Sequence, residues 1–147
     1  MEHTQFISRV RETAALKSRE EAEVTVKAVL ETLGERIPRS ERDHLASQLP
    51  NELKSYLYEY RDTERFGLEE FYNRVGARAS VTYLHAVSRA RAVAGVLRQA
   101  VAAGELEDIL AFVPELADVF SETPDSKLSP ASLTTKQRKR LEDAKGK

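Results

Sequence analysis

Apolar residues recur along the chain at spacings of three and four positions, which is the spacing of one face of an α-helix. The first such stripe covers residues 4–14, and a much longer one covers residues 19–37. Ser18 and Glu21 form a capping box at the start of the longer stripe, where each side chain can bond a free backbone amide. Pro38 cannot continue a helix comfortably. The pattern therefore predicts a short helix followed by a long one that ends at Ile37.

A single residue interrupts the apolar face of the long helix. Gly34 lies within this face, where a glycine costs about 1 kcal/mol relative to alanine. A glycine is useful at such a position when another part of the chain must come close to the helix backbone. We therefore expect a neighbouring helix to approach closely at Gly34.

At two points in the chain, which we call elbows, a hydrophobic residue directly precedes a proline. They are Leu49-Pro50 and Val113-Pro114, and each has a short amphipathic run before it and another after it. The proline should end the first run and let the second fold back. Ser40 is expected to cap the run that leads to the first elbow.

The second half of the chain repeats the order of the first. An opening stripe begins at Leu68, a long helix is expected over residues 82–103, and Gly104 should close it in a left-handed conformation. Matching positions differ by nearly constant offsets: Phe6 and Phe71 by 65, Leu30 and Leu97 by 67, Pro50 and Pro114 by 64. Four helices aligned in one order indicate an internal repeat.

We therefore predict an all-α fold of two tandem four-helix units packed as one globular, bundle-like domain. The units cover about residues 4–61 and 67–121, and the whole helical domain covers residues 1–122. At 147 residues the chain is long enough for one domain with a substantial core. The absence of cysteine excludes disulfides, thiolate metal sites and cysteine nucleophiles.

The sequence contains no apolar run as long as the roughly 18–20 residues that a membrane span needs, so we expect no membrane association. The first residues have no apolar core typical of a signal peptide, and we expect a cytoplasmic protein. Charged residues make up 32% of the chain, yet the net charge is only −1. Such interspersed charge is typical of the surface of a helical protein.

Composition changes near the C-terminus, and residues 123–147 are predicted to form a flexible basic tail. The chain has 16 basic and 20 acidic residues up to Phe120, and 7 basic and 4 acidic residues after it. A loose contact with nucleic acid or with an acidic protein would use the basic side chains of this tail. These are Lys136, Arg138, Lys139 and Arg140.

Glu41 and His44 form a Glu-x-x-His pair, the spacing that dinuclear metal bundles use. A second such pair does not occur in the sequence, and the position equivalent to His44 in the repeat is Asp108. Both members of the pair are expected on the exposed side of a short helix. We therefore predict no metal site and no cofactor. The sequence also contains no phosphate-binding glycine run or nucleophile motif, and we predict no catalytic residues.

Aromatic residues cluster around the junction between the two halves. Tyr58 and Tyr72 lie outside the apolar positions that are expected to face inward, so we expect both side chains to be exposed. Exposed tyrosines can anchor a protein interface. Arg61 and Arg65 lie next to them in the polar link between the halves. These four side chains form the interaction surface that we predict.

Two stretches resemble the bacterial domain-of-unknown-function family numbered 2267: Val29 to Leu57, and Gly104 to Phe120. The shared motifs are an opening Phe-x-x-x-Val helix, a Leu-Gly-Glu-Arg-hydrophobic helix end, a Gln-Leu-Pro elbow and a Gly-Glu-x-Glu-Asp segment. Here they occupy Phe6 and Val10, Leu33 to Ile37, Gln48 to Pro50, and Gly104 to Asp108. The second elbow departs from the pattern because it reads Phe-Val-Pro. The resemblance covers about residues 4–120 and implies an all-helical protein with no assigned activity.

The function that these observations favour is a non-enzymatic protein-interaction or scaffold module that binds a protein partner or a second copy of itself. The first alternative is a regulator that contacts nucleic acid weakly through its basic tail. The second and weaker alternative is a metal-dependent or hydrolytic enzyme. An exposed aromatic patch would favour the first, a continuous positive face the second, and a pocket lined by convergent carboxylates the third.

Overall fold

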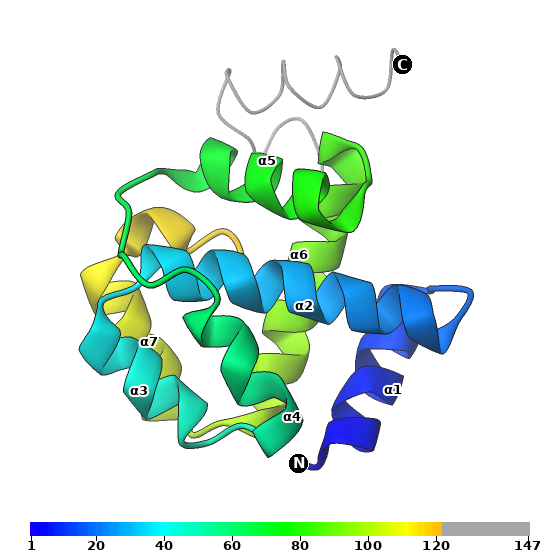
Figure 1. The fold of residues 1–147 in the computed structure, drawn as a ribbon, viewed down its shortest axis with the longest axis horizontal. Helices are drawn as coiled ribbons and strands as arrows, with labels where there is room; N and C mark the ends of the chain where they lie inside the picture. Colours follow the sequence, from blue (N-terminus) through cyan, green and yellow to red (C-terminus); the bar gives the residue numbers. More distant parts are fainter. Residues whose placement is uncertain (122–147) are drawn as a thin grey trace.

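The structure, a computed structural model, describes residues 1–121, and all regular elements in this range are helical (Figure 1). The prediction of an all-α fold is therefore confirmed. The elements in chain order are α1 (His3–Thr13), α2 (Arg19–Arg36), α3 (Arg39–Ala46), α4 (Asn51–Lys54), η1 (Ser55–Tyr58), α5 (Leu68–Ala79), α6 (Tyr83–Ala100), α7 (Ala103–Phe112) and η2 (Pro114–Leu116).

Both long helices begin where local chemistry predicts, and α2 also ends there. The Ser18 hydroxyl accepts a hydrogen bond from the backbone N–H of Glu21 at 3.1 Å, which confirms the predicted cap of α2. Thr82 caps α6 in the same way. Ile37 has an extended backbone directly before Pro38, so α2 stops at the preceding residue as expected.

Two predicted helix boundaries are wrong. Gly104 lies inside α7 and not at the end of α6, and no described glycine has a positive φ. The chain turns earlier because Val101 is extended and the N–H of Ala102 donates to the Gln48 side chain at 2.8 Å. Ser40 lies in the first turn of α3, whose N-cap is Pro38.

The fourth helix of each predicted unit is also shorter than expected. In the first half, α4 and η1 together supply two short turns after Pro50. In the second half, η2 is a single three-residue 3₁₀ turn after Val113. Helical segments this short have little stability of their own. Packing of the buried side chains of Leu53, Leu57 and Leu116 therefore holds these turns in place.

Helix α2 lies at the centre of the molecule. It packs against α1, α5, α6 and η1, and Figure 1 shows it between α5 on one side and α4 on the other. Helix α1 also packs on α6, so each half of the chain completes the core of the other. Apolar side chains from all the helices form one buried cluster.

The expected close approach at Gly34 is present. A Cβ atom at this position would lie only 2.1 Å from the backbone oxygen of Leu57 in η1. Real Cβ atoms are essentially never found so close to another heavy atom, so η1 can pack here only because the side chain is missing.

Within residues 1–121, no helix combines the length and the apolar character that crossing a bilayer would require.

Candidate functional site

Helix α3 from the first half packs against α7 from the second half. Glu41 on α3 is buried, with 6% of its surface exposed, whereas His44 is exposed. The expectation that both residues lie on a solvated face is therefore wrong for Glu41. Helix α7 covers this side of α3. The residue pattern of α3 alone gives no information about which other helix packs on it.

Glu105 of α7 joins these two residues in one cluster. A carboxylate oxygen of Glu41, a ring nitrogen of His44 and a carboxylate oxygen of Glu105 all lie within 4.8 Å of one another. Glu105 is 8% exposed, so the cluster has two buried carboxylates and one imidazole at the surface. The three side chains could hold a cation.

The electrostatics of the cluster are unbalanced. One oxygen of each carboxylate, Oε2 of Glu41 and Oε2 of Glu105, is buried and has no hydrogen-bond partner among the described residues. Burial raises the pKa of Glu105, and the neighbouring carboxylate of Glu41 raises it further, against a lowering contribution from His44. Buried carboxylates without partners are costly, which favours a proton or a cation between them.

Gln48, from the first elbow, fixes the position of Glu105. Its amide nitrogen Nε2 donates to Oε1 of Glu105 at 3.0 Å, and its Oε1 accepts from the N–H of Ala102 at 2.8 Å. One side chain therefore joins the end of α3 to the first turn of α7. The Gln-Leu-Pro motif has a polar role here in addition to its role in the chain reversal.

Sequence reasoning missed Glu105, although a signal was present. The offset of 64 that relates Pro50 to Pro114 also relates Glu41 to Glu105. The same offset places Asp108 opposite His44, so a search for a second Glu-x-x-His pair does not find Glu105. The packing of α3 on α7 brings the two glutamates of the predicted repeat together, and this contact could not be read from the offset alone.

The segment between η1 and α5, residues 59–67, contains no helix and is held in place by a buried arginine. Arg42 on α3 is only 1% exposed. Its guanidinium donates to the backbone oxygens of Tyr60 and Arg61, both at 3.2 Å, and to the hydroxyl of Thr63 at 3.0 Å. A buried arginine on α3 thus satisfies backbone groups of the linking segment.

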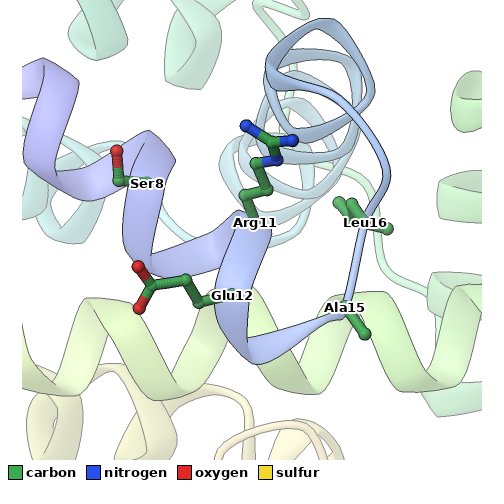
Figure 2. Close-up of a pocket in the computed structure, with 5 residues that line it drawn as sticks. All are labelled: Ser8, Arg11, Glu12, Ala15 and Leu16. Atoms are coloured by element: carbon green, nitrogen blue, oxygen red, sulfur yellow. The ribbon is translucent and has the colours of Figure 1, made fainter.

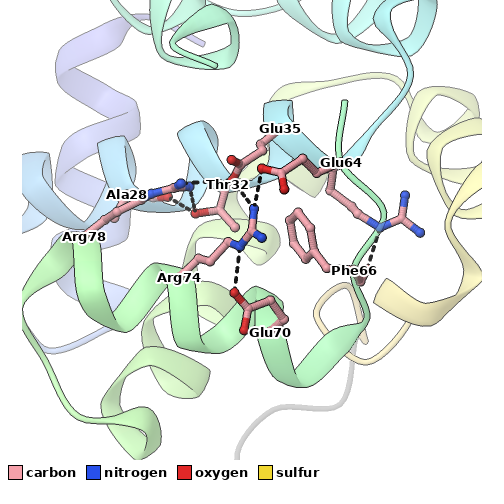
Figure 3. Close-up of polar contacts among 9 residues, drawn as sticks. Ala28, Thr32, Glu35, Glu64, Phe66, Glu70, Arg74 and Arg78 are labelled. Carbon is pink, nitrogen blue, oxygen red and sulfur yellow. Dashed lines mark hydrogen bonds and ion pairs between the residues drawn. The ribbon is translucent and has the colours of Figure 1, made fainter. Parts of the chain in front are cut away.

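The other end of this segment is fixed by contacts with α2 and α5. Arg36 donates to the backbone oxygen of Phe66 at 2.6 Å, and the N–H of Glu64 donates to the backbone oxygen of Glu35 at 2.8 Å. The Cζ atom of Arg74 lies over the Phe66 ring, 4.0 Å from the ring centroid (Figure 3). The cation–π contact and the hydrogen bonds hold the segment against the end of α2.

Arg74 also forms a network of ion pairs beneath this segment (Figure 3). Its guanidinium contacts Glu35 at 3.0 Å, Glu64 at 3.1 Å and Glu70 at 2.8 Å. Arg78 contacts the same carboxylate of Glu35 at 3.0 Å. Because Glu35 is buried, both arginines serve to compensate its charge, which is a structural role.

Three of the four residues of the predicted interaction surface are at least partly accessible. Arg61 and Arg65 are exposed, and Tyr58 is half-buried with its hydroxyl donating to Asp43 at 2.5 Å. Tyr72 is 1% exposed, so its assignment to a surface is wrong. Helix α5 packs on both α2 and α6, and its buried face is therefore wider than one stripe.

Comparison with known protein families matches residues 3–119 to the family described as uncharacterized conserved protein (DUF2267). The chain belongs to this family. The match confirms the resemblance seen in the two elbow stretches, and it covers every helix described above. No curated protein matches the chain.

The DUF2267 region ends before the basic tail. Lys136, Arg138, Lys139 and Arg140 lie outside both the matched region and the described residues. Nucleic-acid contact through these side chains therefore stays a prediction from sequence.

A hollow of about 380 Å³ lies at the end of α1, also inside the family region (Figure 2). It is lined by Ser8, Arg11, Glu12, Ala15 and Leu16, all from α1 and the turn that follows it. Arg11 donates to the backbone oxygen of Lys17 and so stabilises that turn. The hollow is a local feature of the turn and brings together no residues from distant parts of the chain.

Proposed function

We propose that the protein is a non-enzymatic interaction module whose partner surface is formed by residues 58–65, with Tyr58, Arg61 and Arg65 as its contact residues. The observation that carries this proposal is the burial of Arg42, which holds the backbone of this segment in one conformation. An irregular segment fixed in this way is already ordered before a partner arrives.

Preorganisation favours binding because a flexible loop loses conformational entropy when it is ordered at an interface. A loop that is already fixed has lost this entropy during folding, so binding does not include that cost. Arginine and tyrosine are also enriched among the residues that contribute most to protein interfaces. The exposed positions of Arg61 and Arg65 beside the partly exposed Tyr58 agree with both requirements. A protein partner or a second copy of the chain would bind through these side chains.

The double variant Arg61→Glu, Arg65→Glu is expected to fold normally and to lose binding. Both side chains are exposed, so the melting temperature should change by no more than about 2 °C. Self-association measured by sedimentation velocity, or partner capture by the tagged full-length chain, should fall at least about tenfold. The double variant Lys17→Glu, Lys27→Glu makes the same change in net charge at exposed residues outside the segment, and it should bind normally. Equal binding by both variants would contradict the proposal.

We also propose that the two halves are copies of one unit. Support comes from the order of elements, since α2 and α6 each have 18 residues and each is followed by a shorter helix and a proline elbow. In a crystal structure of the protein, α1–α3 should superpose on α5–α7 with one rotation. A different set of crossing angles in the two halves would exclude the repeat.

A further inference from the structure

We propose that Glu41, His44 and Glu105 bind one divalent transition-metal ion of the zinc class between α3 and α7. This site is separate from the proposed partner surface and does not depend on it. It would join an element of the first half of the chain to an element of the second.

The donor geometry fits one ion after a small closure. Two ligands about 2.1 Å from a tetrahedral ion are roughly 3.4 Å apart. The three donor atoms lie within 4.8 Å of one another, so side-chain rotations that move them about 1 Å would complete the coordination. His44 is exposed and can rotate freely enough to make this adjustment.

The second observation that indicates a ligand is the pair of buried oxygens without partners. Oε2 of Glu41 and Oε2 of Glu105 belong to side chains that are 6% and 8% exposed, and neither oxygen accepts a hydrogen bond from a described residue. Native proteins rarely leave buried carboxylate oxygens unpaired. A divalent cation would compensate both carboxylates at once, whereas a single shared proton would compensate only one.

The ligand types select the class of ion. Imidazole nitrogen is a ligand for zinc, iron, nickel and copper, whereas magnesium and calcium prefer an all-oxygen set. Two carboxylates and one histidine leave at least one coordination position for water or another ligand. Because His44 is at the surface, that position would be reached from the solvent side.

Gln48 would act as a positioning residue for the ion. Its hydrogen bond engages Oε1 of Glu105, and Oε2 of the same carboxylate is left without a hydrogen-bond partner among the described residues. Partners of this kind orient a ligand, and their removal commonly weakens metal binding by about 10–100-fold. Gln48→Ala should therefore weaken binding while the stoichiometry stays at one ion.

The test is a titration of the full chain after treatment with EDTA and removal of the chelator. Isothermal titration with ZnCl₂ should show one ion per chain, and MgCl₂ and CaCl₂ should show no binding at the same concentrations. At a free zinc concentration about 100 times the Kd, the melting temperature should rise by about 5–10 °C.

Two variants identify the ligands, and a third serves as the matched control. His44→Gln should weaken zinc binding at least about tenfold and leave the metal-free melting temperature unchanged, because the side chain is exposed. Glu105→Gln should abolish binding and raise the metal-free melting temperature, because the amide can donate to Glu41 and one buried charge is removed. His85→Gln changes an exposed histidine on α6 and should bind zinc normally.

The proposal would be overturned by any of three results. These are no stabilisation or heat of binding with ZnCl₂, zinc binding that persists unchanged in His44→Gln and Glu105→Gln, or equal loss of binding in His85→Gln. If Glu105→Gln does not fold, His44→Gln carries the test alone, since an exposed histidine is not required for folding. None of these results depends on whether residues 58–65 bind a partner.

Discussion

Replacement of Gly34 by alanine is expected to destabilise the protein by about 3 kcal/mol or more. The added Cβ would lie 2.1 Å from the backbone oxygen of Leu57, and backbone atoms cannot move away as the end of a flexible side chain can. Helix α2 and η1 would have to separate along a buried contact. This cost exceeds the gain of about 1 kcal/mol that alanine brings to the interior of a helix. Urea denaturation followed by circular dichroism measures the change.

Gly95 provides the matched control for Gly34. It lies in the interior of α6, a helix of the same length as α2, and no atom other than those of its chain neighbours and its own helix backbone lies within 4 Å of the position that its Cβ would occupy. Gly95→Ala should therefore stabilise the protein by about 0.5–1 kcal/mol. A loss of less than about 1 kcal/mol in Gly34→Ala would show that η1 does not pack closely on α2.

Replacement of Arg42 by methionine is expected to cost about 3 kcal/mol and to release the segment at residues 59–67. Methionine retains the aliphatic volume but donates no hydrogen bonds. The backbone oxygens of Tyr60 and Arg61 and the hydroxyl of Thr63 would lose their donor. Urea denaturation gives the change in stability, and native-state hydrogen exchange shows where the structure loosens.

Arg39→Met is the control for this substitution, because Arg39 is an exposed arginine on the same helix. Its effect should stay within about 0.5 kcal/mol. In Arg42→Met the amide of Glu64, which donates to the backbone oxygen of Glu35, should lose protection earlier than the amides of α2. Uniform loss of protection across the chain would argue against a specific role in holding the segment.

The helices of this protein could be predicted because their signals are local. The capping box at Ser18 and Glu21, and the proline at position 38, act through neighbouring backbone atoms. Gly34 is a further local signal. A glycine on the apolar face of a helix interior indicates that another part of the chain lies close to the helix backbone, as Leu57 does here. Each of these signals concerns one helix and its immediate continuation.

The candidate metal site was not predictable in the same way. The residue pattern of α3 alone predicts an exposed Glu41, and the pattern of α5 alone predicts an exposed Tyr72, but both side chains are buried. Both residues are buried by helices from elsewhere in the sequence. Burial of α3 by α7 depends on how two halves dock, and hydrophobic periodicity does not contain that information.

Arg42 shows the same difficulty for a charged residue. Its position near other charged residues of α3 indicates a solvated side chain, and most arginines are exposed. Its burial becomes reasonable only when the irregular segment at residues 59–67 is seen to need donors for its backbone oxygens. These oxygens need donors because of the path that the loop takes, and the sequence pattern does not determine that path.

The packing of α1 on α6 and of α2 on α5 also determines when the chain can fold during its synthesis. Individual helices form within about a microsecond, but contacts between distant segments must wait until both exist. A ribosome that adds about 5–20 residues per second needs roughly 3–12 seconds to add the 60 or so residues of the second half. During that interval the apolar faces of α1 and α2 lack the helices that cover them. The nascent first half therefore leaves these apolar faces uncovered until α6 has left the exit tunnel.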